Sequence, residues 1–220
     1  KVAPNKYEIS VFGQEDYGNY NRILLSPVLA GEKSVDDIIL NPEEWYSSRG
    51  ITLHKANAVT RINRATKEVT TRKGTTHPYD KLLLATGSNP INLPIAGSDL
   101  QNVMPFRSIR DVKQMLALSQ YKTHAVVIGA GLLGLEAANG LLKQGMDVTV
   151  LHLADHILNR QLDKTAAQIL ERKLSSRGVK FLFGETTERI AGDKTGCVTH
   201  LHLSNGVALK ADLVVMAVGV

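Results

Sequence analysis

The string Gly129-Ala130-Gly131-Leu132-Leu133-Gly134 follows an apolar strand, His124–Ile128, and opens a helix expected over Leu132–Lys143. It fits the pattern G-x-G-x-x-G, whose first glycine permits a tight turn and whose second lets the backbone approach a pyrophosphate. The third lets the helix pack closely on the strand, and the N–H groups at the helix start attract phosphates. Because strand, turn and helix occur in this order, the stretch predicts a dinucleotide site for NAD(P)H. Glycines that merely turn the chain are the plainer alternative.

The position expected to bind the adenosine ribose carries an unusual residue. The fingerprint calls for an acid at the end of the second strand, about 20 residues after the turn. That strand, Val148–His152, ends in a histidine. A neutral imidazole can hydrogen-bond a ribose, whereas a protonated one beside Arg160 would favour a 2′-phosphate, and Asp155 offers an acid from the following loop. The choice between NADH and NADPH therefore stays open.

Strands and helices alternate around this turn. The pattern predicts a parallel α/β fold in the second half of the chain and a run of short strands in the first. Helix starts are expected at Ser34 and at Asn41, the latter as a cap before Pro42. The prolines and glycine of residues 90–105 suggest a linker. Further elements are expected at Tyr7–Phe12, Ile51–His54, Val59–Ile62, Val69–Thr71, Lys81–Ala85, Lys164–Arg177, Val179–Phe183, Cys197–Leu203, Val207–Lys210 and Leu213–Val218.

Composition excludes several classes of protein. With 43% hydrophobic and 21% charged residues, the 220-residue chain is typical of globular proteins. The net charge of +5 is spread along the chain, which argues against a nucleic-acid partner. The apolar stretch of residues 125–142 contains four glycines and Glu136, so it is not expected to span a membrane. One cysteine, Cys197, excludes an internal disulfide and suggests a reducing, cytoplasmic compartment.

Two further features allow a plain and a functional interpretation. Glu136 near the helix start is either an acid that complements the helix dipole or a residue near the nicotinamide. The spacing Cys197-x-x-His200-x-His202 could place metal ligands on one hairpin, but three ligands on an exposed hairpin do not form the closed site that structural zinc requires. No metal site is expected.

Together with two further strings, these residues resemble those of the flavoprotein reductases that carry tandem FAD and NAD(P)H domains. Within that group, the chain resembles the NAD(P)H-dependent nitrite reductase branch. The likeness covers nearly the whole chain. It is carried by the string of residues 20–32, by Leu83-Leu84-Ala85-Thr86-Gly87-Ser88, by the glycine turn running into Glu136, and by residues 148–153 with Arg160-Gln161-Leu162-Asp163.

The resemblance implies roles for individual residues. Glu15 would bind the adenosine ribose of FAD, Arg22 would lie along the FAD pyrophosphate, and Val59 would meet the adenine by its backbone. Thr86 and Gly87 would border the same cofactor. An acid suits a diol and an arginine suits a phosphate. In the other half, Ala217, Val218 and Gly219 would approach the nicotinamide side, with Gly129, Gly131, Leu132, Leu133, Gly134, Glu136 and His152 completing the NAD(P)H site.

The resemblance also predicts the organisation of the molecule. An incomplete FAD domain is expected over 1–106 and an NAD(P)H domain over 107–220, both Rossmann-like three-layer ββα folds with β-meanders. The family's first FAD strand with its glycine turn would precede Lys1, and its C-terminal FAD segment would follow Val220. The chain alone is therefore expected to bind FAD weakly or not at all, and to be inactive by itself.

The expected activity is that of an oxidoreductase in nitrate assimilation. Electrons would pass from NAD(P)H through FAD to iron–sulfur and sirohaem centres further along the polypeptide, or to an acceptor protein, and a homodimer is possible. No catalytic acid or base can be assigned. A rubredoxin or ferredoxin reductase is the enzymatic alternative, and a non-catalytic nucleotide-binding protein the alternative from another class. The related NADH oxidases and coenzyme A disulfide reductases keep a redox cysteine about where Pro27 stands.

Overall fold

A computed structural model describes residues 6–219 of the chain. The chain divides into two compact units, each treated on its own below. The first contains the described residues up to 21 together with residues 36–87. The second contains residues 22–35 and the described residues from 88 onward. The α/β class expected from the sequence is confirmed, whereas the division into cofactor domains near residue 106 stays a prediction.

The second unit is built on a five-stranded parallel sheet with strand order β6-β13-β7-β8-β9. Its central strands are apolar on both faces: β7 is buried from Ala125 onward and β13 throughout. Strands buried on both faces need layers above and below. The strands are β6 (Val103–Pro105), β7 (His124–Ile128), β8 (Asp147–His152), β9 (Lys180–Phe183) and β13 (Leu213–Met216).

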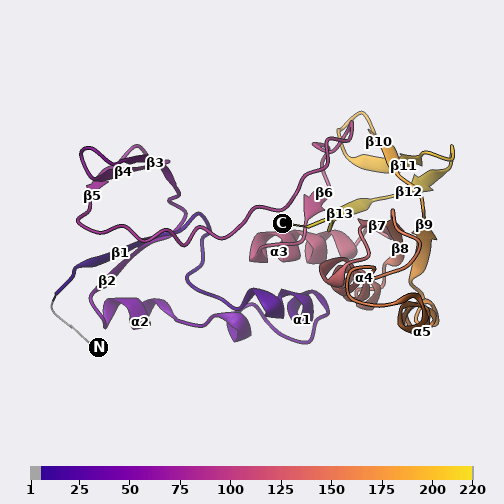
Figure 1. Cartoon of the computed structure of the whole chain (residues 1–220), viewed down its shortest axis with the longest axis horizontal. Helices are drawn as coiled ribbons and strands as arrows, with labels where there is room; N and C mark the ends of the chain where they lie inside the picture. The colour runs from indigo at the N-terminus through magenta and orange to yellow at the C-terminus, as the bar shows by residue number, and fades with distance from the viewer. Residues whose placement is uncertain (1–5, 220) are drawn as a thin grey trace. The chain divides into compact units, whose positions relative to one another are not determined.

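Helices cover one face of this sheet and an antiparallel sheet covers the other (Figure 1). Apolar residues of β7, β8 and β13 share a core with residues of the antiparallel sheet β10-β11-β12, among them Ile190 and Leu201. The result is the three-layer arrangement that the sequence predicted. The elements are α1 (Leu25–Leu29), α3 (Ile109–Ser119), α4 (Leu132–Lys143), α5 (Lys164–Ser175), β10 (Thr187–Gly192), β11 (Val198–Leu203) and β12 (Ala208–Lys210).

The first unit contains two small sheets. Strands β1 (Ile9–Phe12) and β2 (Ile51–His54) pair in parallel, and β3 (Val59–Asn63), β4 (Glu68–Thr71) and β5 (Thr76–Pro78) form an antiparallel meander. The short helix α2 (Glu43–Ser47) packs on β2. Two 3-10 turns, η1 (Arg22–Leu24) and η2 (Asp36–Ile38), flank α1 in the sequence.

Two local predictions in the first half were wrong. Residues 81–85 form no strand, and Leu83 is 88% exposed. An apolar run becomes a strand only when a neighbour takes up its backbone hydrogen bonds, and no pairing within residues 6–219 includes this run. Helix α2 is capped by extended Pro42 without a side-chain hydrogen bond, so Asn41 lies one residue too early to be its cap.

Other elements escaped the sequence analysis. Within the expected linker, residues 103–105 form the edge strand β6, where a proline at the strand end is tolerated. Helix α3 follows at once and opens with a capping box between Ser108 and Asp111. Strand β10 completes the antiparallel sheet. In the part of the chain that the structure describes, no helix has the length and apolarity to cross a bilayer.

Candidate dinucleotide-binding site

The glycine turn lies at the carboxyl end of β7, between its two neighbouring strands. Gly129 N–H donates to Leu151 O at the end of β8 at 2.8 Å. Ala217 N–H, just past β13, donates to Ile128 O at 2.9 Å. Ligands of open parallel sheets bind outside the carboxyl ends of their strands, so the turn has the position that its motif predicts.

Each of the three glycines suits its position for a different structural reason. Gly129 has φ +111°, and an added Cβ would overlap Ala217 O. An added Cβ at Gly134 would overlap Gly129 O, so this residue permits the close approach of helix to turn. A Cβ at Gly131 would meet no atom within 4 Å, and its backbone is extended. Gly131 therefore faces open space, as a residue beside a pyrophosphate should.

The start of α4 has the features of an anion site. The first amides of a helix have no acceptor within it, and the helix dipole adds partial positive charge. Gly131 caps α4 without a side-chain hydrogen bond. Leu132 and Leu133 in the first turn are 58% and 41% exposed, which leaves this end of the helix accessible. These residues fit the phosphates of a dinucleotide.

His152 at the end of β8 contacts the turn directly. Ala130 N–H donates to His152 Nδ1 at 3.3 Å, and His152 Nε2 lies 3.2 Å from Asn159 Oδ1. The main chain of the loop after β8 also contacts the turn, because Leu158 N–H donates to Ala130 O at 2.9 Å. The predicted ribose residue therefore links the glycine turn to the loop after β8.

Asp155 in that loop is bound by Lys164 and His156 rather than free for a ribose. Its carboxylate lies 2.5 Å from both Lys164 Nζ and His156 Nδ1. The hydrogen bonds from Lys164 and then from His156 lower the pKa of Asp155 to about 2. Asp155 thus stays charged and paired, which weakens the alternative that it supplies the ribose acid.

Glu136 makes a contact that the sequence does not reveal. Ser26 Oγ of α1 donates to Glu136 Oε2 of α4 at 2.5 Å, although the two residues are 110 positions apart. Glu136 is exposed and Ser26 is half-buried. The contact holds the carboxylate near the glycine turn of the same helix, so Glu136 is more than an acid that complements the helix dipole.

Ala217 and Val218 lie next to Gly129, whereas the approach of residues 217–219 to the nicotinamide side stays a prediction. Ala217 O approaches Gly129, and Gly219 has φ +125°. Ile91 N–H donates to Gly219 O at 3.0 Å. The second unit thus brings together Gly129, Gly131, Leu132, Leu133, Gly134, Glu136 and His152 on one helix start and the neighbouring strand end. Gly219 lies two residues after Ala217 in the sequence.

The residues expected to bind FAD are less clearly assembled. In the first unit, Glu15 accepts a hydrogen bond from Tyr20 Oη at 2.6 Å, and its carbonyl accepts from Ala56 N–H at 2.9 Å. The turn before β3 therefore lies beside Glu15, and Val59 at the start of β3 is partly exposed. Thr86 and Gly87 are exposed in a segment without regular structure.

Arg22 belongs to the second unit, where its guanidinium donates to Arg107 O at 3.0 Å. Arg107 in turn donates to Ser88 Oγ at 2.8 Å. These contacts hold the first residue of η1 against the segment before α3. The role of Arg22 at a FAD pyrophosphate stays a prediction.

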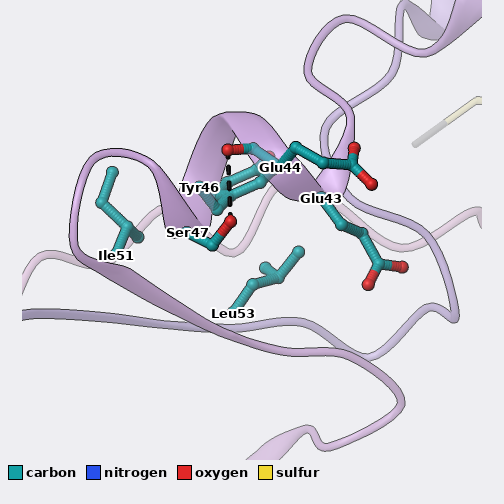
Figure 2. A pocket seen from close by; sticks show the side chains of 6 residues that line it. All are labelled: Glu43, Glu44, Tyr46, Ser47, Ile51 and Leu53. Atoms are coloured by element: carbon teal, nitrogen blue, oxygen red, sulfur yellow. Dashed lines mark hydrogen bonds between the residues drawn. The ribbon is translucent and has the colours of Figure 1, made fainter.

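A hollow on the first unit is not a second site of this kind. Figure 2 shows that it lies between α2 and β2 and is lined by Glu43, Glu44, Tyr46, Ser47, Ile51 and Leu53. Its polar groups have partners nearby: Ser47 Oγ donates to Glu44 O at 3.2 Å, and Glu43 forms an ion pair with Lys55. The hollow is explained as the surface where a short helix meets a strand.

Comparison with known proteins identifies the family. The family model described as pyridine nucleotide-disulphide oxidoreductase matches residues 1–220. The chain belongs to this family. It is 48% identical over 219 residues to the nitrite reductase [NAD(P)H] of Bacillus subtilis and 47% identical over 220 residues to that organism's assimilatory nitrate reductase electron transfer subunit. Both alignments cover 100% of this chain but only 27% and 28% of the two relatives.

Solved structures agree in fold. The ferredoxin reductase of the CYP199A2 system from Rhodopseudomonas palustris matches with a TM-score of 0.89 and 27% identity, over 99% of this chain and 54% of that one. Putidaredoxin reductase, in a covalent complex with putidaredoxin, matches with a TM-score of 0.88 and 28% identity, again over 99% and 54%. The resemblance predicted from the sequence is confirmed at the level of the family and its nitrite reductase relatives.

Despite the family's name, this chain has no second thiol for a redox disulfide. Its single cysteine, Cys197, donates to Gln101 Oε1 at 3.4 Å beside the antiparallel sheet. Among residues 6–219, no three histidine, cysteine or acidic side chains gather as a metal site.

Three residues near the dinucleotide site were not predicted from the sequence. Ser26, Ile91 and Asn159 each contact a predicted residue from a distant or irregular segment. Ser26 and Asn159 had a signal, because Ser26 lies within the string of residues 20–32 that carries the resemblance and Asn159 precedes the string that begins at Arg160. Contacts across 110 positions leave no mark on local periodicity.

Proposed function

We propose that the chain is the NAD(P)H-oxidising flavoprotein part of an NAD(P)H-dependent nitrite reductase. The observation that carries the proposal is the glycine turn at the carboxyl end of β7, with the exposed start of α4 beside it. The 48% identity to a nitrite reductase [NAD(P)H] supports the choice of branch. Since the chain spans about a quarter of that relative, the activity belongs to the whole protein.

In this proposal the second unit binds and orients NAD(P)H. The amides at the start of α4 bind the pyrophosphate, and His152 lies at the ribose. Residues 217–219 and Glu136, held by Ser26, lie on the nicotinamide side. When bound, FAD would accept a hydride from the nicotinamide and release electrons singly to later carriers.

The FAD side of the proposal rests on the family pattern. Glu15 would hold the adenosine ribose, Val59 the adenine and Arg22 the pyrophosphate. Thr86 and Gly87 would border the cofactor. Support comes from the backbone contact between Glu15 O and Ala56 N–H, which brings Glu15 beside the turn that leads into the exposed start of β3.

The remaining parts of the proposal concern the whole protein. Iron–sulfur and sirohaem centres, carried elsewhere on the polypeptide or by an acceptor protein, would receive the electrons. The single cysteine supports a reducing compartment, and we place the protein in the cytoplasm. A homodimer stays a prediction.

The test is reduction of the flavin in the full-length protein. Anaerobic mixing with NADH or NADPH should bleach the flavin absorption band, and the Gly131→Val variant should require at least about tenfold more nucleotide because its side chain occupies the space of the pyrophosphate. The midpoint of thermal unfolding of this variant should fall by no more than about 8 °C, the shift for about 1 kcal/mol, since a Cβ there meets no protein atom within 4 Å and valine is only a poorer helix N-cap than glycine. A flavin that keeps its absorption with both nucleotides would contradict the proposal.

A second candidate function is reduction of a small electron carrier. The likeness to ferredoxin reductase and the 30% identity to the rubredoxin–NAD(+) reductase of Ectopseudomonas oleovorans favour it. The two functions differ in the acceptor. Nitrite-dependent oxidation of NAD(P)H by the full-length protein supports the first, whereas oxidation that requires added rubredoxin or ferredoxin supports the second.

A further inference from the structure

The antiparallel sheet β10-β11-β12 (Figure 1) carries four basic side chains on its outer face. Arg189 of β10 lies opposite His202 of β11, and His200 of β11 lies opposite Lys210 of β12. Leu201, between the two histidines, is fully buried in the core beneath the sheet. Because side chains alternate along a strand, the four basic ones point away from this core. Arg189, His200 and Lys210 are exposed and His202 is half-buried, so together they form a surface that we call the basic face.

The spacing within the basic face brings groups of the same charge sign close together. Opposite side chains of an antiparallel pair have Cβ atoms about 4.5–5.5 Å apart, and like charges at this range destabilise a sheet. The two rows of the basic face are about 7 Å apart along β11. Arg189 and Lys210 carry permanent charges, and an imidazole takes up a proton readily near an anion. An anionic partner that covered both rows would replace repulsion with attraction.

The acids that neighbour these strands in the sequence do not neutralise the basic face. Asp193 and Asp212 accept hydrogen bonds from backbone N–H groups, and Lys210 attracts Asp212 only from beyond ion-pair distance. Glu188 is exposed in the bulge before Arg189. Within residues 6–219, no ion pair or hydrogen bond joins any side chain of the basic face to an acid. Its positive charge is therefore open to a partner.

We propose that the basic face is a docking surface for an acidic protein segment, whose aspartates and glutamates lie across both rows at once. Charge complementarity selects this occupant, since the face offers cations in two rows and no bound acid. A second copy of this chain fits poorly, because the chain has a net charge of +5. The face is also much shorter than the basic stripe that tracks a nucleic-acid backbone. The inference does not depend on the proposed NAD(P)H site.

The test titrates the full-length protein at low salt with a short, fluorescently labelled polyglutamate peptide and follows its anisotropy. The double variant Arg189→Gln/Lys210→Gln should bind the peptide at least about threefold more weakly than wild type, since each exposed ion pair contributes little. The matched control Lys173→Gln/Arg177→Gln removes two exposed charges from the end of α5 and should stay within about twofold of wild type. High salt should remove the difference.

The free protein gives a second readout. Because the double variant relieves repulsion on the sheet, its midpoint of urea unfolding should be equal to or higher than that of wild type. If the double variant does not fold, Arg189→Gln and Lys210→Gln are each compared with Lys173→Gln, and each should weaken peptide binding more than this control.

Three results would overturn the inference. One is the absence of peptide binding to wild type at low salt. Another is equal weakening in the double variant and its control, because the peptide would then respond to net charge rather than to this face. The third is an oligothymidylate that binds more tightly than the peptide and loses affinity in Arg189→Gln/Lys210→Gln alone, because the face would then serve a nucleic acid.

Discussion

Gly131 and Gly134 lie three residues apart, and a methyl group added to each should have effects of different size on stability. At Gly134 it would overlap Gly129 O, so Gly134→Ala should lower the free energy of unfolding by about 1–3 kcal/mol. Gly131→Ala should change it by less than about 1 kcal/mol, because its Cβ meets open space. Chemical denaturation of both variants checks this, and equal losses would refute the separate roles assigned to the two glycines.

Asp212 is a second residue whose contribution to stability can be measured with a single substitution. Its carboxylate accepts from His124 N–H at 3.0 Å and from Thr123 N–H at 3.2 Å, ahead of β7. Burial raises its pKa, but these hydrogen bonds outweigh burial and lower the pKa of Asp212 below its ordinary value. Asp212→Ala should therefore cost about 1–3 kcal/mol near neutral pH, whereas Asp147→Ala, at an exposed carboxylate, should cost under about 0.5 kcal/mol.

The pH dependence of that loss has a definite sign. A carboxylate whose pKa is lowered by folding stabilises the protein above its unfolded pKa, about 4 for aspartate, and loses this contribution as the pH falls through the folded value. The difference between wild type and Asp212→Ala should thus be full near neutral pH and shrink below about pH 4. Urea unfolding at several pH values measures it, and a difference that grows on acidification would contradict the assignment.

At the scale of elements, α1 is attached to α4 by a contact between Leu29 and Gly140. Leu29 is fully buried, and a Cβ at Gly140 would lie 2.7 Å from Leu29 Cγ. Gly140→Ala should cost about 1–3 kcal/mol in wild type. In the Leu29→Ala background it should cost less than in wild type, since only the Cβ of residue 29, at 3.2 Å, stays close to the added methyl group and alanine favours helix. Additive losses in this double-mutant cycle would contradict the contact.

Elements of the second half were predictable because their own residues show the apolar runs and glycines that indicate strands and helix starts. Strand β7 and helix α4 have the predicted bounds, set by a continuous apolar run and by the glycines before the helix. The run of residues 81–85 has the same apolar character, yet it forms no strand. The two runs differ in whether a neighbouring strand is present. Strand β7 pairs with β13 and β8, and such pairing depends on segments far away in the sequence.

For the molecule as a whole, the sequence predicted those residues of the candidate site that lie close together along the chain. It missed those that come from distant segments. The glycine turn, Glu136 and His152 follow from spacing along one βαβ stretch. Ser26 and Ile91 come from other parts of the chain, and residues 22–35 join the unit that holds the turn only through tertiary packing. No periodicity indicates that this short segment of the first half packs with the second.

Because the site is assembled from these segments, nucleotide binding should change stability and hydrogen exchange in particular parts of the chain. NADP⁺ at about 100 times its dissociation constant should stabilise the native state by about 2.7 kcal/mol, because it binds only the folded site. In the full-length protein, hydrogen exchange should slow in residues 129–135, 152–158 and 217–219, and exchange in β3, β4 and β5 should stay unchanged. ADP-ribose, which lacks the nicotinamide, should protect the glycine turn but leave residues 217–219 exchanging as before. Protection centred on the β3–β5 meander would instead place the nucleotide in the first unit and contradict the site described here.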